Sequence, residues 1–229
     1  MSRVAARKSR PALSRDLIAE TAMRMTLEQP TTPLTLTRLG TELAADPTAL
    51  YRHFRSRDEL IRELGDRLYA EIGATVEITS DWAASLQSVA TTVRAVLLQR
   101  PALAADLGTR FTGGDHERDG VRRLREIFVD AGFPEDRIAR QVQGFGELML
   151  AHVVMTASLL CMTPDQQEYE HRVSLSLYGP HTSTTSLELE DDTFAEILDT
   201  YLSGLRLQLE QTQGHREGVN MINEQRGEL

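Results

Sequence analysis

The sequence predicts an all-α protein in which a small N-terminal domain of three helices, containing a helix-turn-helix, precedes a larger helical domain. Apolar residues recur along most of the 229 residues at the three- and four-residue spacing of amphipathic helices. Sustained alternation of apolar and polar residues, which is typical of strands, is not found in the sequence. Capping residues recur before the apolar segments, and prolines or glycines follow several of them.

The first two helices are bounded by capping residues and prolines. Ser14 can cap a helix that runs to about Glu28, and Pro30 lies just beyond its end. Thr35 opens a shorter helix that extends to about Ala44. The apolar face of this second helix consists of Leu36, Leu39 and Leu43. This face is expected to pack against the neighbouring helices and to hold the second and third helices at a steep crossing.

A tight turn separates the second helix from the third. Asp46 and Pro47 combine an N-cap with a proline at the first helical position, which predicts that a third helix starts here. Ser56 and Glu59 have the spacing of a capping box and predict a longer fourth helix toward Ile78.

The rest of the chain carries five further helical segments. They are expected over residues 81–99, 102–107, 115–131, 134–162 and 193–213. The intervening residues 163–191 are polar and contain Pro164 and the pair Gly179-Pro180. We therefore interpret them as a long connection with room for a short helix around 166–172.

The distribution of charge is more informative than its sum. A net charge of −9 argues against indiscriminate coating of nucleic acid. Residues 1–70 nevertheless hold 12 Arg and Lys against 9 Asp and Glu, a net charge of +3, whereas residues 71–229 hold 13 against 25, a net charge of −12. Residues 1–15 include five cations and no acid. Such a basic arm either contacts DNA beside a helix-turn-helix or is a loose solubilising terminus.

The most specific pattern lies between residues 34 and 60. The small residues Thr48 and Ala49 stand at the start of the third helix, where they let a backbone approach the edges of bases. Residues 46–54 read DPTALYRHF, and residues 56–60 read SRDEL. Together with the leucine-rich second helix, these motifs resemble the DNA-binding domain of TetR-type transcriptional repressors over about residues 12–65.

The resemblance implies roles for individual residues. Those expected to contact DNA are Thr37, Arg38, Pro47, Thr48, Ala49, Tyr51, Arg52, His53 and Arg57. Pro47, Thr48 and Ala49 occupy base-reading positions, whereas Tyr51, His53 and Arg57 resemble phosphate contacts that set the docking. The resemblance also implies a homodimer that binds a palindromic double-stranded operator and whose C-terminal domain binds a small-molecule effector that releases the DNA.

The sequence departs from the family pattern in the turn. Ala44 stands where glycine is usual, and Ala45 stands where an aliphatic residue is usual. Asp46 replaces the commoner serine cap. A carboxylate caps well, but its charge is unfavourable beside phosphates, so it is expected to sit back from the DNA backbone or to restrain binding.

Two helices are too apolar for one chain to cover. The segments at about 137–162 and 193–213 carry apolar residues around most of their circumference. A partner chain is the natural cover, so we expect a homodimer formed through these two helices; a larger monomeric core is the alternative. Glu147 and His152 favour a buried helix over a membrane span.

An effector pocket is expected between the helices of the second domain. A mostly apolar site with a few polar anchors is typical of small-molecule binding. The expected lining residues are Trp82, Leu86, Phe111, Phe128, Phe145, Met149, His152 and Thr156. Taken singly, each of them favours ordinary core packing, whereas together they favour a pocket in this region.

Enzyme functions find no support in the motifs. The six histidines are dispersed, and no nucleophile elbow or phosphate-binding glycine loop follows a strand. Cys161 is the single cysteine, which excludes an intrachain disulfide and a cysteine-based zinc site. We expect no catalytic residues, no metal and no cofactor.

The predicted organisation has four parts. They are a basic arm over residues 1–11, a helix-turn-helix DNA-binding domain over 12–60, a helical regulatory and dimerisation domain over 61–213, and a flexible tail over 214–229. The predicted function is that of a cytoplasmic transcriptional repressor released from its operator by an effector. The alternatives are a transcriptional activator, or a helical-bundle ligand carrier or enzyme with a degenerate DNA-binding module.

Overall fold

A computed structural model describes residues 12–108, 110–179 and 183–227, with the side chains of 213 and 215–227 excepted. The predicted basic arm therefore lies outside the described residues. Within them every regular element is a helix. The helices are α1 (Arg15–Glu28), α2 (Leu36–Leu43), α3 (Pro47–Leu50), α4 (Arg57–Thr75), α5 (Trp82–Leu98), α6 (Pro101–Leu107), α7 (Asp115–Asp130), α8 (Glu135–Leu160), α9 (Pro164–Tyr178) and α10 (Ser186–Gly227).

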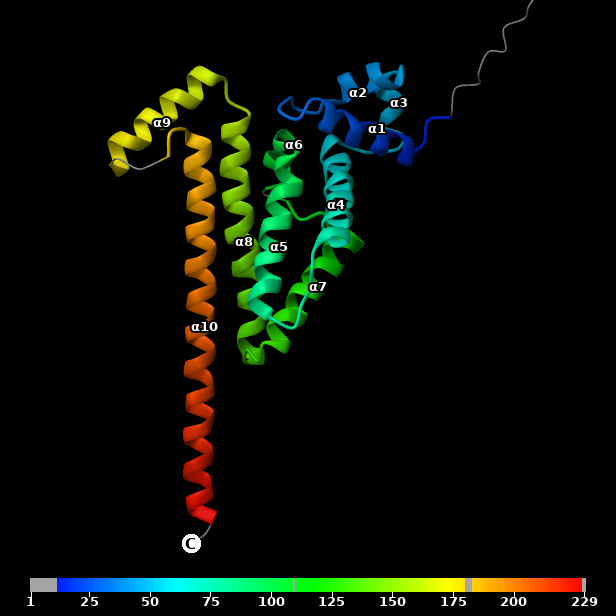
Figure 1. Cartoon of the computed structure of the whole chain (residues 1–229). Coiled ribbons are helices and arrows are strands. Elements are labelled where there is room, and N and C mark those ends of the chain that lie inside the picture. The colour runs from blue at the N-terminus through cyan, green and yellow to red at the C-terminus, as the bar shows by residue number, and fades with distance from the viewer. Residues whose placement is uncertain (1–11, 109, 180–182, 228–229) are drawn as a thin grey trace, which may run out of the picture.

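The first three helices form a small unit at one end of the molecule (Figure 1). Ser14 and Thr35 cap α1 and α2 as the sequence predicts, each accepting a hydrogen bond from a backbone N–H in the first turn. Leu39, Leu50 and Phe54 are almost completely buried together with residues of α1 and of the start of α4. The buried apolar face of each short helix thus holds the helix-turn-helix in one arrangement.

Helix α4 leads from the small unit into the helical body (Figure 1). Its buried residues Leu60, Leu64 and Leu68 belong to one apolar cluster with residues of α1, α5, α6 and α8. The predicted boundary at residue 60 falls inside this continuous helix. The two parts of the chain therefore share a core, which gives a direct mechanical connection between them.

Helix α8 occupies the centre of the body and packs against α5, α6, α7 and α10. It is the one helix among the described residues that is long and apolar enough to cross a membrane by length and composition. Its packing against four helices is that of a core helix.

The short helix expected around residues 166–172 is present, but residues 163–191 are more helical than predicted. Most of this segment forms α9, which projects beside the upper end of α10 (Figure 1). Thr163 caps α9 in a capping box with Gln166, and Pro164 occupies the first helical turn. These signals are present in the sequence, but the polar composition of the segment concealed them.

Helix α10 also begins earlier than predicted and continues farther. Its first turn is stabilised by Thr185, whose hydroxyl accepts a hydrogen bond from the backbone N–H of Glu188 at 3.1 Å. Thr193, which the sequence suggests as the cap, lies inside the helix. A capping-box pattern can therefore lie inside a helix when another capping residue precedes it and starts the helix earlier.

Candidate functional site

The turn between α2 and α3 brings two backbone segments into close contact. The N–H of Ala45 donates to the carbonyl oxygen of Gly40 at 2.8 Å. A Cβ atom on Gly40 would lie 2.9 Å from the Ala45 oxygen, which real side chains do not tolerate. Ala44 adopts the left-handed conformation, with φ 41° and ψ 47°. The turn is thus tight, and alanine stands at a position where glycine would be unstrained.

Asp46 caps α3 in a way that also fixes its neighbour. One carboxylate oxygen, Oδ1, accepts hydrogen bonds from the backbone N–H of Thr48 at 2.8 Å and from the Thr48 hydroxyl at 2.7 Å. These two hydrogen bonds lower the pKa of Asp46, so the carboxylate is ionised at neutral pH. Asp46 and Thr48 are both exposed at the start of the helix.

Several predicted DNA contacts form an accessible surface around α3. Thr37, Thr48, Tyr51 and Arg52 are exposed, and Pro47, Ala49 and His53 are partly exposed. Within the described part of the chain, the Arg52 guanidinium makes no hydrogen bond or ion pair. The regular helix α3 ends at Leu50, so Tyr51, Arg52 and His53 lie in the turn that follows it.

Two predicted DNA contacts are engaged inside the protein. The Arg38 guanidinium donates to the carbonyl oxygen of Pro33 and to Oε1 of Gln29, both at 2.5 Å. Arg57 donates through Nε to the carbonyl oxygen of Leu34 at 2.8 Å and pairs with Asp106 of α6. In this arrangement both side chains organise the protein itself.

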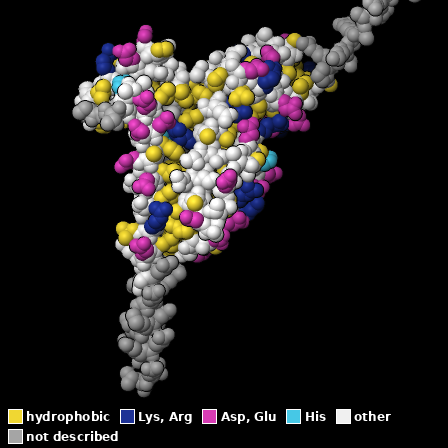
Figure 2. Space-filling model, in the orientation of Figure 1, with side chains coloured by type: hydrophobic (Ala, Val, Ile, Leu, Met, Phe, Trp, Pro, Cys, Tyr) yellow, Lys and Arg dark blue, Asp and Glu magenta, His cyan; other side chains and the backbone are white. Residues whose placement is uncertain are grey.

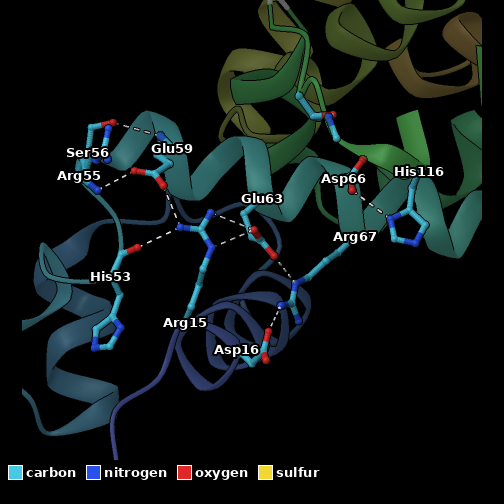
Figure 3. A network of polar contacts seen from close by, with 12 residues as sticks. Arg15, Asp16, His53, Arg55, Ser56, Glu59, Glu63, Asp66, Arg67 and His116 are labelled. Carbon is cyan, nitrogen blue, oxygen red and sulfur yellow. Dashed lines mark hydrogen bonds and ion pairs between the residues drawn. The ribbon is translucent and has the colours of Figure 1, made fainter. Parts of the chain in front are cut away.

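A network of ion pairs that the sequence did not reveal supports the segment after α3 (Figure 3). Arg15 pairs with Glu59 at 2.8 Å and with Glu63 at 3.0 Å, and it donates to the carbonyl oxygen of His53 at 3.0 Å. Its guanidinium also lies 4.1 Å from the centre of the Phe54 ring. Although Arg15 is one of the basic residues of the N-terminal sequence, it joins α1 to α4 and holds the backbone beside the exposed surface.

The predicted pocket residues divide into three groups. Leu86, Phe128, Phe145 and Met149 lie in one buried apolar cluster, and Trp82 packs against it through Phe133, with ring centres 5.9 Å apart. His152 and Thr156 lie farther along α8. Phe111 belongs to neither group, since it is 79% exposed in the segment before α7.

His152 and Thr156 belong to a buried polar cluster between α5, α8 and α10. The Thr156 hydroxyl contacts Oε2 of Glu190 at 3.3 Å, and Nδ1 of His152 lies 3.8 Å from the same oxygen. The His152 ring packs on the ring of Phe194, and the Arg94 guanidinium lies 4.9 Å from the centre of that phenyl ring. Burial lowers the pKa of His152, an effect that Glu190 opposes and Arg94 reinforces.

The body is closely packed in the state described. An enclosed cavity of about 10 Å³ lies between α4, α5, α6 and α8, which is room for about one water molecule. It is lined by residues that include Tyr69, Leu97 and Leu150, and none of the predicted pocket residues borders it.

Comparison with known proteins gives a consistent result. Residues 77–209, more than half of the chain, match the family described as tetracyclin repressor-like, C-terminal domain. An HTH-type transcriptional regulator of Saccharopolyspora erythraea is 27% identical over 126 residues, which cover 55% of this chain and 53% of that protein. The match thus spans about half the length of this relative.

Solved structures share the fold along most of the chain. ActR of Streptomyces coelicolor in complex with actinorhodin gives a TM-score of 0.67 at 22% identity, covering 86% of this chain and 98% of that one. A TetR variant from Acinetobacter baumannii AYE in complex with minocycline gives a TM-score of 0.63 at 20% identity, with the same coverage of both chains. The predicted all-α, two-domain architecture is confirmed.

Proposed function

Because this chain belongs to the TetR family of transcriptional regulators, whose C-terminal domain it matches over residues 77–209, we propose that it is a cytoplasmic homodimeric repressor. The dimer binds a palindromic operator, and a small-molecule effector releases it. The observation that carries the proposal is the accessible surface of a capped α3. There Thr48, Tyr51 and Arg52 are exposed on the helix-turn-helix.

The contacts divide into base reading and docking. Thr48 and Ala49 stand in the first turn of α3, the part of a recognition helix that approaches base edges in a major groove. Arg52 is free to reach a phosphate or a base, and Tyr51 is exposed beside it. Arg38 and Arg57 act indirectly, by holding the loop before α2 and the start of α4 in place.

Dimerisation would cover apolar surface that the single chain leaves open. Met155 on α8 is 64% exposed and Leu207 on α10 is 55% exposed. Hydrophobic side chains remain visible along the column that α8 and α10 form (Figure 2). Two-fold pairing through these helices would match the symmetry of a palindrome, with half-sites about 34–36 Å apart.

Release by an effector would use the shared core. Two solved relatives are complexes with actinorhodin and minocycline, and we propose that this chain likewise binds a small molecule in its second domain. Entry of such a molecule would push apart helices that pack on α4. Since α4 is continuous with the DNA-binding unit, the separation of the two recognition helices would change and operator affinity would fall.

Gel-shift assays on the DNA that flanks the gene for this chain test the proposal. The wild type is expected to bind one segment at modest salt and to resist competition by random DNA. Arg52→Ala is expected to weaken this binding by roughly 5- to 100-fold without changing the far-UV circular dichroism. Arg118→Ala, a change on the exposed face of α7, is the matched control. Binding that is equal for specific and random DNA would contradict the proposal.

A further inference from the structure

We propose that the start of α3 presents only hydrogen-bond acceptors to DNA and therefore reads an exocyclic amino group, N4 of cytosine or N6 of adenine, in each half-site. This inference rests on the proposed function and adds a base preference to it. The juxtaposition that carries it is the hydrogen bond from the Thr48 hydroxyl to the Asp46 carboxylate, 2.7 Å long.

A threonine hydroxyl has one hydrogen to donate and two lone pairs that accept. In this structure the hydrogen of Thr48 is directed to Oδ1 of Asp46. The same oxygen accepts the backbone N–H of Thr48 at 2.8 Å, which holds the carboxylate in place. A hydrogen bond to an ionised acceptor is stronger than one between neutral groups, so the Thr48 hydrogen stays committed to Asp46. The hydroxyl oxygen can then only accept from an outside partner.

Asp46 contributes acceptors of the same kind. An ionised carboxylate accepts hydrogen bonds and donates none. Both hydrogen bonds that the Asp46 side chain accepts use Oδ1, and within the described residues Oδ2 has no hydrogen-bond partner. Asp46 is exposed beside Thr48. A surface of this kind repels the acceptor edge of a base and attracts a donor.

The major groove offers a restricted set of donors. Cytosine presents N4–H and adenine presents N6–H, whereas guanine presents the acceptors N7 and O6 and thymine presents the acceptor O4. A threonine hydroxyl is ordinarily able to face either kind of edge. The hydrogen bond to Asp46 removes that ambiguity, because the hydroxyl oxygen can then only accept. This position therefore selects a base whose edge donates a hydrogen bond, which is cytosine or adenine.

The test begins with wild-type protein and a pool of duplexes that have a randomised core of about 20 base pairs, long enough for two half-sites one helical turn apart. Selected duplexes are then resynthesised with single amino groups deleted, 2-pyrimidinone replacing a cytosine or purine replacing an adenine. At one position in each half-site, deletion is expected to weaken wild-type binding on the order of tenfold. The base whose deletion has this effect tells cytosine from adenine.

Variants identify the residue that reads this amino group. Thr48→Val keeps the branched shape but loses the hydroxyl oxygen, so it is expected to lose most of the difference between the intact and the deleted duplex. Thr48→Ser keeps the hydroxyl and is expected to retain the difference of about tenfold. Asp46→Ala frees the hydroxyl to donate and is expected to reduce the discrimination, and circular dichroism of each variant checks that the helices persist.

Two different results would overturn the inference. If a sequence is enriched but no amino deletion affects wild-type binding, or if Thr48→Val retains the wild-type pattern, the inference is wrong and the proposed function stands. If no sequence is enriched from the pool, the proposed function fails and the inference fails with it.

Discussion

Arg57 and Asp106 join the first turn of α4 to α6 by an ion pair with two contacts, one of them 3.2 Å long between Nη1 and Oδ1. The same guanidinium holds the carbonyl oxygen of Leu34 at the entrance to α2. One side chain therefore connects the start of the helix-turn-helix, the connecting helix and the regulatory body. A residue that resembles a phosphate contact in the sequence thus links the two domains in this structure.

Arg57→Gln and Asp106→Asn are expected to destabilise the protein through the same interaction. A double-mutant cycle from urea unfolding should give a coupling free energy of about 0.5–1 kcal/mol, because the pair is only partly shielded from solvent. The salt dependence of DNA binding should be unchanged in Arg57→Gln, since no phosphate contact is lost. If the magnitude of the slope of log affinity against log salt decreases by about 1 in this variant alone, Arg57 contacts a DNA phosphate and the assignment to the protein interior is contradicted.

Ala44→Gly is expected to stabilise the protein by about 0.5–1 kcal/mol. Ala44 is the one non-glycine residue with positive φ among those the structure describes, and glycine adopts this conformation without the steric cost of a Cβ atom. Thermal unfolding measures the change. Ala45→Gly is the control one position away, where the gain should be absent. A lower melting temperature for Ala44→Gly would show that the turn is not strained.

The stability of the folded protein is expected to fall as the pH is lowered below about 6.5, the ordinary pKa of histidine. Burial lowers the pKa of His152, so the unfolded chain binds a proton there more readily than the folded chain. Stability from this group is thus complete above the unfolded pKa and is lost as the pH falls toward the folded pKa.

Melting temperatures between about pH 8 and pH 5.5, a range that spans the ordinary histidine pKa, test this expectation for His152→Gln. This variant should lose part of the pH dependence that the wild type shows. His53→Gln, which removes a histidine whose ring makes no hydrogen bond or ion pair among the described residues, serves as the control. The same pH dependence in His152→Gln and the wild type would rule out His152 as its source.

Met155→Glu is expected to weaken the dimer, because it places a charge in the apolar surface that pairing would cover. Sedimentation of the wild type should give the mass of two chains, and the variant should shift toward one chain at micromolar concentration. Val129→Glu changes a comparably apolar exposed residue on α7 and should leave the mass unchanged. A monomeric wild type would contradict the proposed assembly.

The helices of the N-terminal unit were predictable because their signals are local. Ser14, Thr35, Asp46 and Ser56 each accept a hydrogen bond from the helix that they precede, as their positions in the sequence suggest. The first turn of α10 was misplaced because Thr185 and Thr193 both offer caps. Tertiary packing decides between such competing signals, and this packing cannot be read from a single sequence.

The exposed part of the candidate site was predictable from its motif, but the partners of its arginines were not. Arg15 finds Glu59 and Glu63, which are 44 and 48 positions away. Arg57 finds Asp106, which is 49 positions away. Exposed charges carry no periodicity that reveals their partners. Only the folded chain separates arginines that hold the domain together from Arg52, which stays available.

Hydroxyl-radical footprinting of a selected duplex bound by the wild-type protein tests the central claim, two-fold binding to a palindromic operator, most directly. Two protected patches of equal size are expected, related by two-fold symmetry and centred about 34–36 Å apart or a multiple of that distance. Arg52→Ala should lose both patches together at the same protein concentration. Protection that is uniform along the duplex, or a single patch without symmetry, would contradict the claim.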